Sequence, residues 1–364
     1  MAETAIGRLD AKAVKHYSLA LSGQTFQTSF FGKNFMSEDG NKPIHRIMKL
    51  QNEAGDTVTV DLFNNLTGYG IKGDNELKGN EEALTSATQQ FWIDQLRHGV
   101  SLGGNMTRQR TKHNLRDIAR EKLTIWWSRM FDEALMVYLT GTRGDETGDW
   151  LMSPSTVTAG TTKLYGNNTV TAFASDYVMY ADTTNSTDSD VGTTSAEYMS
   201  LSFLERVAYN LKTMSNKPRP IMMDGKEKYV LILHPAAAYQ LRSSTSSGEW
   251  RDILKNTDEG TKKIYSGALG EYGPFLLYEH AKVPVVSGGN SGVCYNLLMG
   301  AQAGFLAHGN AGNGLHFDWH EEVDDRGAKP VIDTAAVFGV QRSIYDSKDF
   351  ATMLLKTTNG AATA

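Results

Sequence analysis

The residues best suited to chemistry in this chain lie in a glycine-rich, basic stretch, residues 97–122, with the sequence RHGVSLGGNMTRQRTKHNLRDIAREK. A glycine loop that leads into a helix can cradle a phosphate, and the Walker form of that loop has the spacing G-x-x-x-x-G-K-[ST]. Gly99 and Gly104 have the first part of this spacing, but Asn105 and Met106 stand where the lysine and the hydroxyl residue are required. The stretch therefore favours a flexible junction at the start of a helix over a phosphate site.

The same stretch carries basic residues at a helical spacing. Arg108, Lys112 and Arg116 follow one another at intervals of four, so on a helix they would share one face. Arg120 extends this basic spine face by another turn. Aromatic side chains for base stacking are not interleaved with it. A solvated helix face is favoured, because charge runs usually are solvated, and contact with an acidic neighbour or with DNA phosphate is the alternative.

The best candidate for a metal site is HFDWHEEVDD, residues 316–325, where His316 and His320 are four residues apart and acidic residues follow. A metalloprotease helix has the pattern H-E-x-x-H, with a glutamate directly after the first histidine. Here Phe317 takes the place of that glutamate, and the alternation of Phe317 and Trp319 with polar residues indicates a strand. In a strand the two histidines lie two pleats apart, so a polar strand face is favoured over a metal site.

Candidate nucleophiles are few. Cys294 is the only cysteine, which excludes an intrachain disulfide and a cysteine-based zinc site, and its neighbours are those of a buried strand residue. His234 ends an apolar strand just before Pro235, where a capped core histidine is more common than a catalytic one. Neither a nucleophile triad nor a paired-carboxylate site can be assembled. The sequence therefore predicts no catalytic residue, no cofactor and no metal.

Whole-chain composition sets wider limits on function. The chain has 364 residues, of which 40% are hydrophobic and 21% charged, as in an ordinary globular protein. A net charge of −5 excludes a chain that coats nucleic acid through bulk positive charge. No run of eighteen apolar residues occurs, so no membrane partner is expected.

A long hairpin is predicted before the basic stretch. Strand-like runs occur within residues 45–63 and 89–100, and the segment between them is polar and rich in glycine. We call residues 68–82, GYGIKGDNELKGNEE, the hairpin tip. Its charged side chains have mixed sign and suit docking on the charges of a neighbouring subunit. The basic spine face is one surface that could accept them. The charged residues of the tip are Lys72, Asp74, Glu76, Lys78, Glu81 and Glu82. Residues 30–43, upstream, are expected to be turn material.

One outsized helix is the strongest element that the sequence predicts. Apolar residues recur at intervals of three and four from Leu115 to Val137, with Trp126 on the stripe that should face the body. Counted from about Met106, the helix would be roughly 35 residues long and would end at Gly141. Loop-rich sequence, a helix, a buried strand and several further strands follow, so the fold class is α+β.

Several stretches, in their order along the chain, carry a family resemblance. They are FWIDQLRHGVSLGGNMTRQRT leading into LRDIAREKLTIWWSRMFDEAL, then KYVLILHPAAAYQLR, EWRDILKN and YSGALGEYGPFLLYEHAKVP, and finally LLMGAQAGFLAHG, WHEEVDD and VIDTAAVFGVQRSIYDSKDFATMLLKT. Together they resemble the Hong Kong 97-like major capsid proteins of tailed phages, in the subfamily named after the N-four coliphage group.

This resemblance implies a particular division of the chain within an α+β, Hong Kong 97-like capsid fold. The expected parts are an N-terminal arm (1–45), an extended hairpin loop (46–105), a peripheral domain with the spine helix (106–150), a mainly axial domain with a loop-rich insertion (151–315) and return strands of the peripheral domain (316–364).

The resemblance also implies a structural function. The chain would be a major capsid protein that self-assembles as hexamers and pentamers into an icosahedral head around packaged double-stranded DNA, which it would contact weakly and without sequence specificity. Gly103 and Gly104 would be a pivot about which the hairpin swings relative to the spine helix. The expected partners are a separate scaffolding protein, a portal and, optionally, a decoration or cement protein. The expected location is the virion capsid, after assembly in the host bacterial cytoplasm.

Two functions of other kinds stay open on the sequence. One is a phosphate-handling enzyme that uses the loop from Gly99 to Arg110. The other is an encapsulin-type compartment shell, which would share the fold and carry cargo in place of DNA.

Overall fold

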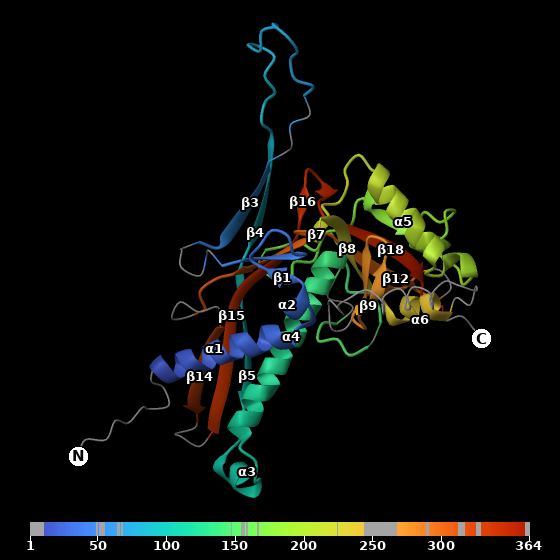
Figure 1. Ribbon diagram of the computed structural model, residues 1–364. Helices are drawn as coiled ribbons and strands as arrows, with labels where there is room; N and C mark the ends of the chain where they lie inside the picture. Colours follow the sequence, from blue (N-terminus) through green and yellow to red (C-terminus); the bar gives the residue numbers. More distant parts are fainter. Residues whose placement is uncertain are drawn as a thin grey trace.

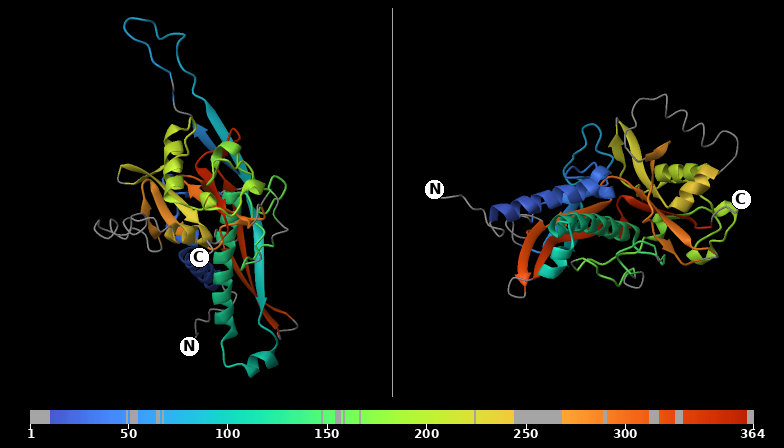
Figure 2. Two further views of the ribbon diagram at one scale, coloured as in Figure 1. Left: turned by 90° about the vertical axis from the view of Figure 1, so that its right-hand side faces the viewer. Right: turned by 90° about the horizontal axis from the view of Figure 1, so that it is seen from below.

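The computed structural model describes residues 11–48, 50, 55–63, 66, 68–146, 148–153, 157, 159–165, 167–223, 225–243, 268–288, 291–311, 317–324 and 329–360. The molecule is elongated, with a hairpin projecting from one end and a short helix at the other (Figure 1). Figure 2 shows from a second direction that the hairpin and the short helix lie at opposite ends. Two larger sheets and one long helix form the body between them.

A six-stranded sheet runs along the length of the molecule. Its strands are β1 (Met36–Ser37), β2 (Ile44–Ile47), β5 (Asp94–Ser101), β13 (Gly304–His308), β14 (Phe317–Asp324) and β15 (Lys329–Arg342). The long strand β15 pairs with β5 along one edge, and with β14 and then β13 along the other, antiparallel in each case. β13 pairs in turn with β2, and β2 with β1, both in parallel.

An eight-stranded sheet forms the other half of the body. Its strands are β6 (Val178–Tyr180), β7 (Ile221–Met223), β8 (Lys226–Leu233), β9 (Ala268–Tyr272), β10 (Phe275–Glu279), β11 (Val285–Val286), β12 (Val293–Met299) and β18 (Thr352–Thr358). Helices α5 (Leu201–Thr213) and α6 (Pro235–Ser243) bury their apolar faces in one cluster with this sheet. The predicted buried strand before Pro235 is confirmed as β8.

The spine helix is shorter than predicted and is preceded by a separate short helix. α3 (Asn105–Arg110) ends where Thr111 takes an extended conformation, and α4 (Leu115–Thr140) begins after the cap residue Asn114. The side chain of Asn114 accepts a hydrogen bond from the backbone N–H of Arg116, as a helix N-cap does. α4 therefore has 26 residues, or about 39 Å. The predicted end is confirmed, since Gly141 has the left-handed φ of 74° typical of a glycine C-cap.

The tryptophan of α4 that faces the core is Trp127 and not, as predicted, Trp126. Trp127 has no exposed surface, whereas Trp126 is half-buried and stacks on His98 with ring centroids 4.0 Å apart. Trp127 meets the sheet instead, edge to face with Phe317 at 5.3 Å. The apolar stripe therefore lies one residue further along the helix than the sequence indicated at this point.

The expected N-terminal arm begins with helices in the part that the structure describes. α1 (Ala11–Thr28) crosses α4, and Phe26 packs on Phe131 at a centroid distance of 5.6 Å. The prediction of turn material was wrong for the next residues, which form helix α2 (Phe30–Asn34). Asp132 of α4 stabilises the start of α2, because its carboxylate accepts hydrogen bonds from the Ser29 hydroxyl and from two backbone N–H groups.

The loop-rich segment from 141 to 197 is confirmed as such. Its described residues form only β6, the isolated pair Lys163–Thr169 and three short 3-10 helices, which are Ser175–Tyr177, Asp188–Asp190 and Ser195–Glu197. The expected division of the chain beyond this segment does not follow the two sheets. β13, within 151–315, belongs to the six-stranded sheet, and β18, within 316–364, belongs to the eight-stranded sheet. A small ribbon of β16 (Ile344–Tyr345) and β17 (Lys348–Asp349) separates β15 from β18.

Candidate assembly surfaces

The predicted hairpin is confirmed. β3 (Thr57–Phe63) and β4 (Ser86–Trp92) pair antiparallel from Thr57 opposite Trp92 to Phe63 opposite Ser86. Side chains alternate between the two faces, as they must in a strand, with Ala87, Gln89 and Phe91 buried between exposed neighbours. Beyond the paired strands the chain continues away from the body into the hairpin tip (Figure 2).

The hairpin tip offers both charge and apolar surface to solvent. Tyr69 is 92% exposed and Leu77 is 61% exposed. The six predicted charged residues are all exposed as well. Two of their carboxylates fold back on the tip's backbone, because Glu82 accepts a hydrogen bond from Gly68 N at 2.6 Å and Glu81 one from Gly79 N at 2.7 Å. These local bonds hold the loop in shape and leave its outer surface accessible.

The hairpin leaves the body at a root, by which we mean Thr57–Val60 of β3 and Gln89–Ile93. Phe91 of the root stacks on Phe305 of β13 with centroids 5.9 Å apart. The Gln89 side chain donates to the carbonyl of Arg342 at 2.7 Å and accepts from the N–H of Ile344 at 2.9 Å. We did not predict these contacts, because they join residues that are more than 200 positions apart in the sequence.

The predicted basic spine face does not exist as one helix face. Arg108 lies in α3, Lys112 is exposed between the helices, and Arg116 and Arg120 lie in α4. The cause is the break at Asn114, which ends the four-residue spacing on which the prediction depended. Arg116 forms an ion pair with Glu321 of β14 at 2.7 Å, so its charge serves contact within the chain.

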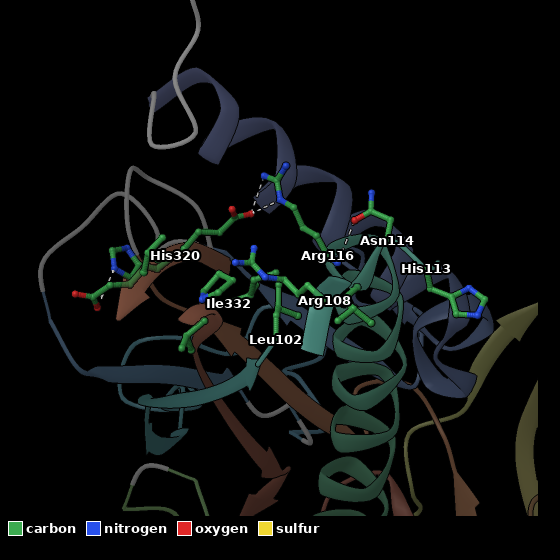
Figure 3. Close-up of a pocket in the computed structure, with 13 residues that line it drawn as sticks. Leu102, Arg108, His113, Asn114, Arg116, His320 and Ile332 are labelled. Carbon is green, nitrogen blue, oxygen red and sulfur yellow. Dashed lines mark hydrogen bonds and ion pairs between the residues drawn. The ribbon is translucent and has the colours of Figure 1, made fainter. Parts of the chain in front are cut away.

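Arg108 and Arg116 nevertheless meet at a hollow beside the start of α4. The hollow has a volume of about 710 Å³, with Leu102, Ile332 and other apolar residues on one side. Figure 3 shows Arg108 pointing between Leu102 and Ile332, while His113 points away. Polar side chains of β14, His320 among them, complete the lining. The hollow is therefore an apolar depression with charged side chains around it, at the opposite end of the molecule from the hairpin tip.

The structure does not form the proposed phosphate loop. Gly99 lies inside β5, opposite Asp333 of β15. A Cβ atom at Gly99 would lie 2.1 Å from Oδ1 of Asp333, so the Asp333 side chain packs directly against this glycine. A residue held in a sheet cannot curl around an anion, and the acidic neighbour would repel a phosphate.

Gly103 and Gly104 connect β5 to α3 at the end remote from the hairpin. Gly103 has a φ of +71°, which favours glycine, and Gly104 precedes α3 with a φ of −79°. β5 is fixed to β15 from Asp94 to Ser101, so a rotation at these glycines would displace α3 and not the hairpin.

The predicted strand over the candidate metal residues is confirmed as β14. His320 is exposed there, 3.9 Å from Glu322, and His316 lies outside the described residues. Among the residues that the structure describes, no group of three or more metal-binding side chains occurs. None of the described helices is long and apolar enough to cross a membrane.

Cys294, His234 and Glu146 form a series of contacts that the sequence did not indicate, and Glu146 is at its partly exposed end. The Cys294 sulfur lies 3.4 Å from Nδ1 of His234, and Nε2 of His234 lies 3.8 Å from Glu146. Nδ1 also accepts a hydrogen bond from the N–H of Ala236, so the ring is held as an N-terminal cap of α6. Burial raises the pKa of the Cys294 thiol and lowers the pKa of His234 to about 4. A protonated thiol with no exposed surface cannot act as a nucleophile.

Comparisons with known proteins agree with this architecture. A family model described as phage capsid protein matches residues 5–357. The major capsid protein of Pseudomonas phage KPP25 is 27% identical over 368 residues, which cover 94% of this chain and 93% of that protein.

Solved structures show the same fold. The capsid of Ralstonia phage GP4 superposes with a TM-score of 0.81 at 28% identity, over 98% of both chains. The Cyanophage Pam1 capsid asymmetric unit has a TM-score of 0.69 at 17% identity, over 90% of this chain and 91% of that one. The expected α+β, Hong Kong 97-like capsid fold is thereby confirmed. The chain belongs to the phage capsid protein family: it is a major capsid protein, a structural protein that assembles with copies of itself into the virion shell of a tailed bacteriophage.

Proposed function

We propose that this chain forms the hexamers and pentamers of an icosahedral head, and that the hairpin tip binds a neighbouring subunit. The observation that carries the proposal is the projection of an ordered hairpin, with Tyr69 92% exposed, away from the body. A loop with so little of its own to bury cannot offset the entropy of ordering without an external partner. A second copy of the chain is the partner that every shell supplies.

The position of the tip favours a head-to-tail contact. The tip and the hollow beside Arg108 lie at opposite ends of the molecule, so one chain cannot join its own two surfaces (Figure 1). A contact between two different surfaces is heterologous, and such contacts close into rings or continue into larger lattices. The tip carries four acidic and two basic side chains, and Arg108 and Lys112 are cations at the other end. We therefore propose that these two residues, in place of the four-residue basic spine face, bind the hairpin tip of a neighbouring subunit.

The two sheets support an assignment of the capsid domains. We assign the six-stranded sheet with α4 to the peripheral domain, and the eight-stranded sheet with α5 and α6 to the axial domain. Membership of the subfamily named after the N-four coliphage group is part of the proposal, and it is supported by the sequence stretches that resemble it.

The remaining parts of the proposal concern partners and activity. We propose assembly in the host bacterial cytoplasm with a separate scaffolding protein and a portal, optional binding of a decoration protein, and weak non-specific contact with the packaged double-stranded DNA. We also propose that the chain has no catalytic activity. The position of Gly99 within β5 counts against a phosphate-handling enzyme. The family match counts against an encapsulin-type compartment.

Replacement of residues 70–80 by a short Gly-Ser turn tests the role of the tip. The shortened chain should fold, because the paired strands and the root keep all their contacts. It should not form shells, since each intersubunit contact of about 0–1 kcal/mol is repeated across the whole assembly. Circular dichroism checks the fold, and sedimentation with scaffold present checks assembly.

A matched control keeps the length of the tip and changes only its chemistry. Tyr69→Ser and Leu77→Ser together remove the exposed apolar side chains and should lower the yield of shells without affecting the melting temperature. Normal shells from the chain with the Gly-Ser turn would exclude the tip from an intersubunit role.

A further inference from the structure

The loop-rich segment supplies one side chain that holds the root of the hairpin. Asn168, which is 2% exposed, donates from Nδ2 to the carbonyl of Trp92 at 2.6 Å. Its Oδ1 accepts from the N–H of the same residue at 2.7 Å. Trp92 is the last residue of β4, and its other neighbour across the ladder is Thr57 of β3. Asn168 thus pairs with the outer edge of β4 as one residue of a further strand would.

The same asparagine is fixed to the spine helix. The hydroxyl of Tyr138 in α4 donates to the carbonyl of Asn168 at 3.0 Å and accepts from the N–H of Tyr165 at 3.0 Å. Tyr138 is 1% exposed, so both bonds are shielded from water. A continuous series of hydrogen bonds therefore runs from α4 through Asn168 to the root.

Close packing restricts the root to one position. A Cβ atom at Gly339 of β15 would lie 2.1 Å from the carbonyl oxygen of Trp92, so the root passes directly over this glycine. Beyond Trp92 the chain turns at Ile93 and enters β5. A small shift of Trp92 on β15 would be carried along β3 and β4 to the tip, because the paired strands move together.

We infer that Asn168 is a positioning residue that sets the direction of the hairpin and makes it follow the spine helix. This inference deepens the proposed function and rests on it, since the direction matters because the tip must reach a neighbouring subunit. Asn168 does not touch the tip. It acts through Trp92, and Tyr138 acts through Asn168.

Hydrogen exchange measured by mass spectrometry on the unassembled full-length chain tests the inference. Asn168→Asp keeps the acceptor for Trp92 N–H and places an oxygen against the Trp92 carbonyl. The matched control is Asn296→Asp. Asn296 is equally buried, accepts from His234 N at 2.9 Å and donates to the Leu355 carbonyl at 3.1 Å within the other sheet. Exchange in the root is compared with exchange in α5, which neither asparagine contacts through a hydrogen bond described here, so a general loss of stability cancels.

We expect exchange in the root to rise about 5- to 30-fold relative to α5 in Asn168→Asp, as the loss of one or two hydrogen bonds predicts. Asn296→Asp should not raise this ratio. Tyr138→Phe, which keeps the ring and removes only the hydroxyl, should raise it by a smaller factor although Tyr138 lies two contacts away from β4. In assembly with scaffold, Asn168→Asp should yield open or irregular particles in place of closed shells.

Three results would overturn the inference. They are an unchanged exchange ratio in both Asn168→Asp and Tyr138→Phe, an equal rise in Asn296→Asp, and normal closed shells from an Asn168→Asp chain whose root exchanges faster. Tyr138→Phe keeps the test valid if Asn168→Asp does not fold. Failure of the proposed function would look different: normal shells from the chain with the Gly-Ser tip, whatever the exchange of the root.

Discussion

The indole nitrogen of Trp127 in α4 donates a 2.8 Å hydrogen bond to the hydroxyl of Thr334 in β15, and that hydroxyl donates to the carbonyl of His98 in β5 at 3.0 Å. The spine helix, the central strand and the strand that leads to the hairpin are thus joined at one buried point. Because Trp127 is fully buried there, its contribution to stability can be compared directly with that of its neighbour in the sequence.

Trp127→Ala should lose about 3–5 kcal/mol of unfolding free energy, since deleting a large buried aromatic leaves a cavity. Trp126→Ala is the matched control. Its indole is half-buried and stacks on His98, so the loss should be smaller, with about 0.5–1.5 kcal/mol from the stack itself. Urea denaturation followed by circular dichroism measures both. A larger loss for Trp126→Ala would show that the helix register described here is wrong.

Lys282→Met should be strongly destabilising. Lys282 lies 2.6 Å from Glu133, whose side chain has no exposed surface and also accepts from the N–H groups of Leu151 and Met152. Removing the cation leaves a buried carboxylate without its counter-charge, which costs about 3–5 kcal/mol.

The control for this pair is Arg129→Met in the same region. Arg129 pairs with Asp149 at 2.7 Å, but the Asp149 side chain is 87% exposed, so the expected loss is about 0–1 kcal/mol. Thermal unfolding of the two variants side by side is the measurement. Equal changes in melting temperature would contradict the distinction between a buried and an exposed ion pair.

Mild acid should weaken the fold through two histidines. Burial lowers the pKa of His280 and of His234 to about 4 in the folded chain, and the nearby Lys282 lowers that of His280 further. An unfolded histidine has a pKa of about 6.5, so between these values the unfolded state binds more protons. Stability is therefore complete above about pH 6.5 and decreases as the pH falls towards 4, by roughly 1–2 kcal/mol for each histidine at pH 5.

His280→Asn should reduce the loss of stability between pH 7 and pH 5, because one of the two proton-binding groups is gone. His320→Asn changes an exposed histidine of β14 and should leave that loss unaltered. Melting temperatures at the two pH values give the answer, and a wild-type chain equally stable at both would refute the linkage.

Gly103→Ala and Gly104→Ala together test whether these glycines are needed only to avoid backbone strain or also act as a pivot during assembly. Alanine at position 103 must adopt a φ of +71° with the Thr107 side chain 3.3 Å away, which costs roughly 1–2 kcal/mol. At position 104 the φ is −79°, and within the described part of the chain nothing lies within 4 Å of an added Cβ. We expect a lower melting temperature only for Gly103→Ala and closed shells from Gly104→Ala. Folded Gly104→Ala protein that fails to assemble would restore the pivot hypothesis.

The features that could be read from the sequence are those that depend on the spacing of neighbouring residues. Alternation of apolar and polar residues in β14 and the left-handed glycine that ends α4 are local properties, so they could be predicted. The charged hairpin tip followed from composition, because a polar, glycine-rich segment has little to bury. The capsid fold was implied by the resemblance of several sequence stretches, in their order along the chain, to a known family.

Which elements meet depends on packing across the whole chain, and local sequence does not show it. Asn114 could have continued a helix, and the capping bond to Arg116, together with the pairing of Arg116 and Glu321, divides the expected single helix in two. Asn168 and Trp92 are 76 positions apart, and nothing in their local sequence distinguishes them. The same is true of β18, whose buried residues would suit either sheet. Local patterns specify how a segment folds, whereas its partners are chosen by the burial and hydrogen bonding of the whole chain, which is why the root of the hairpin could not be predicted from the sequence.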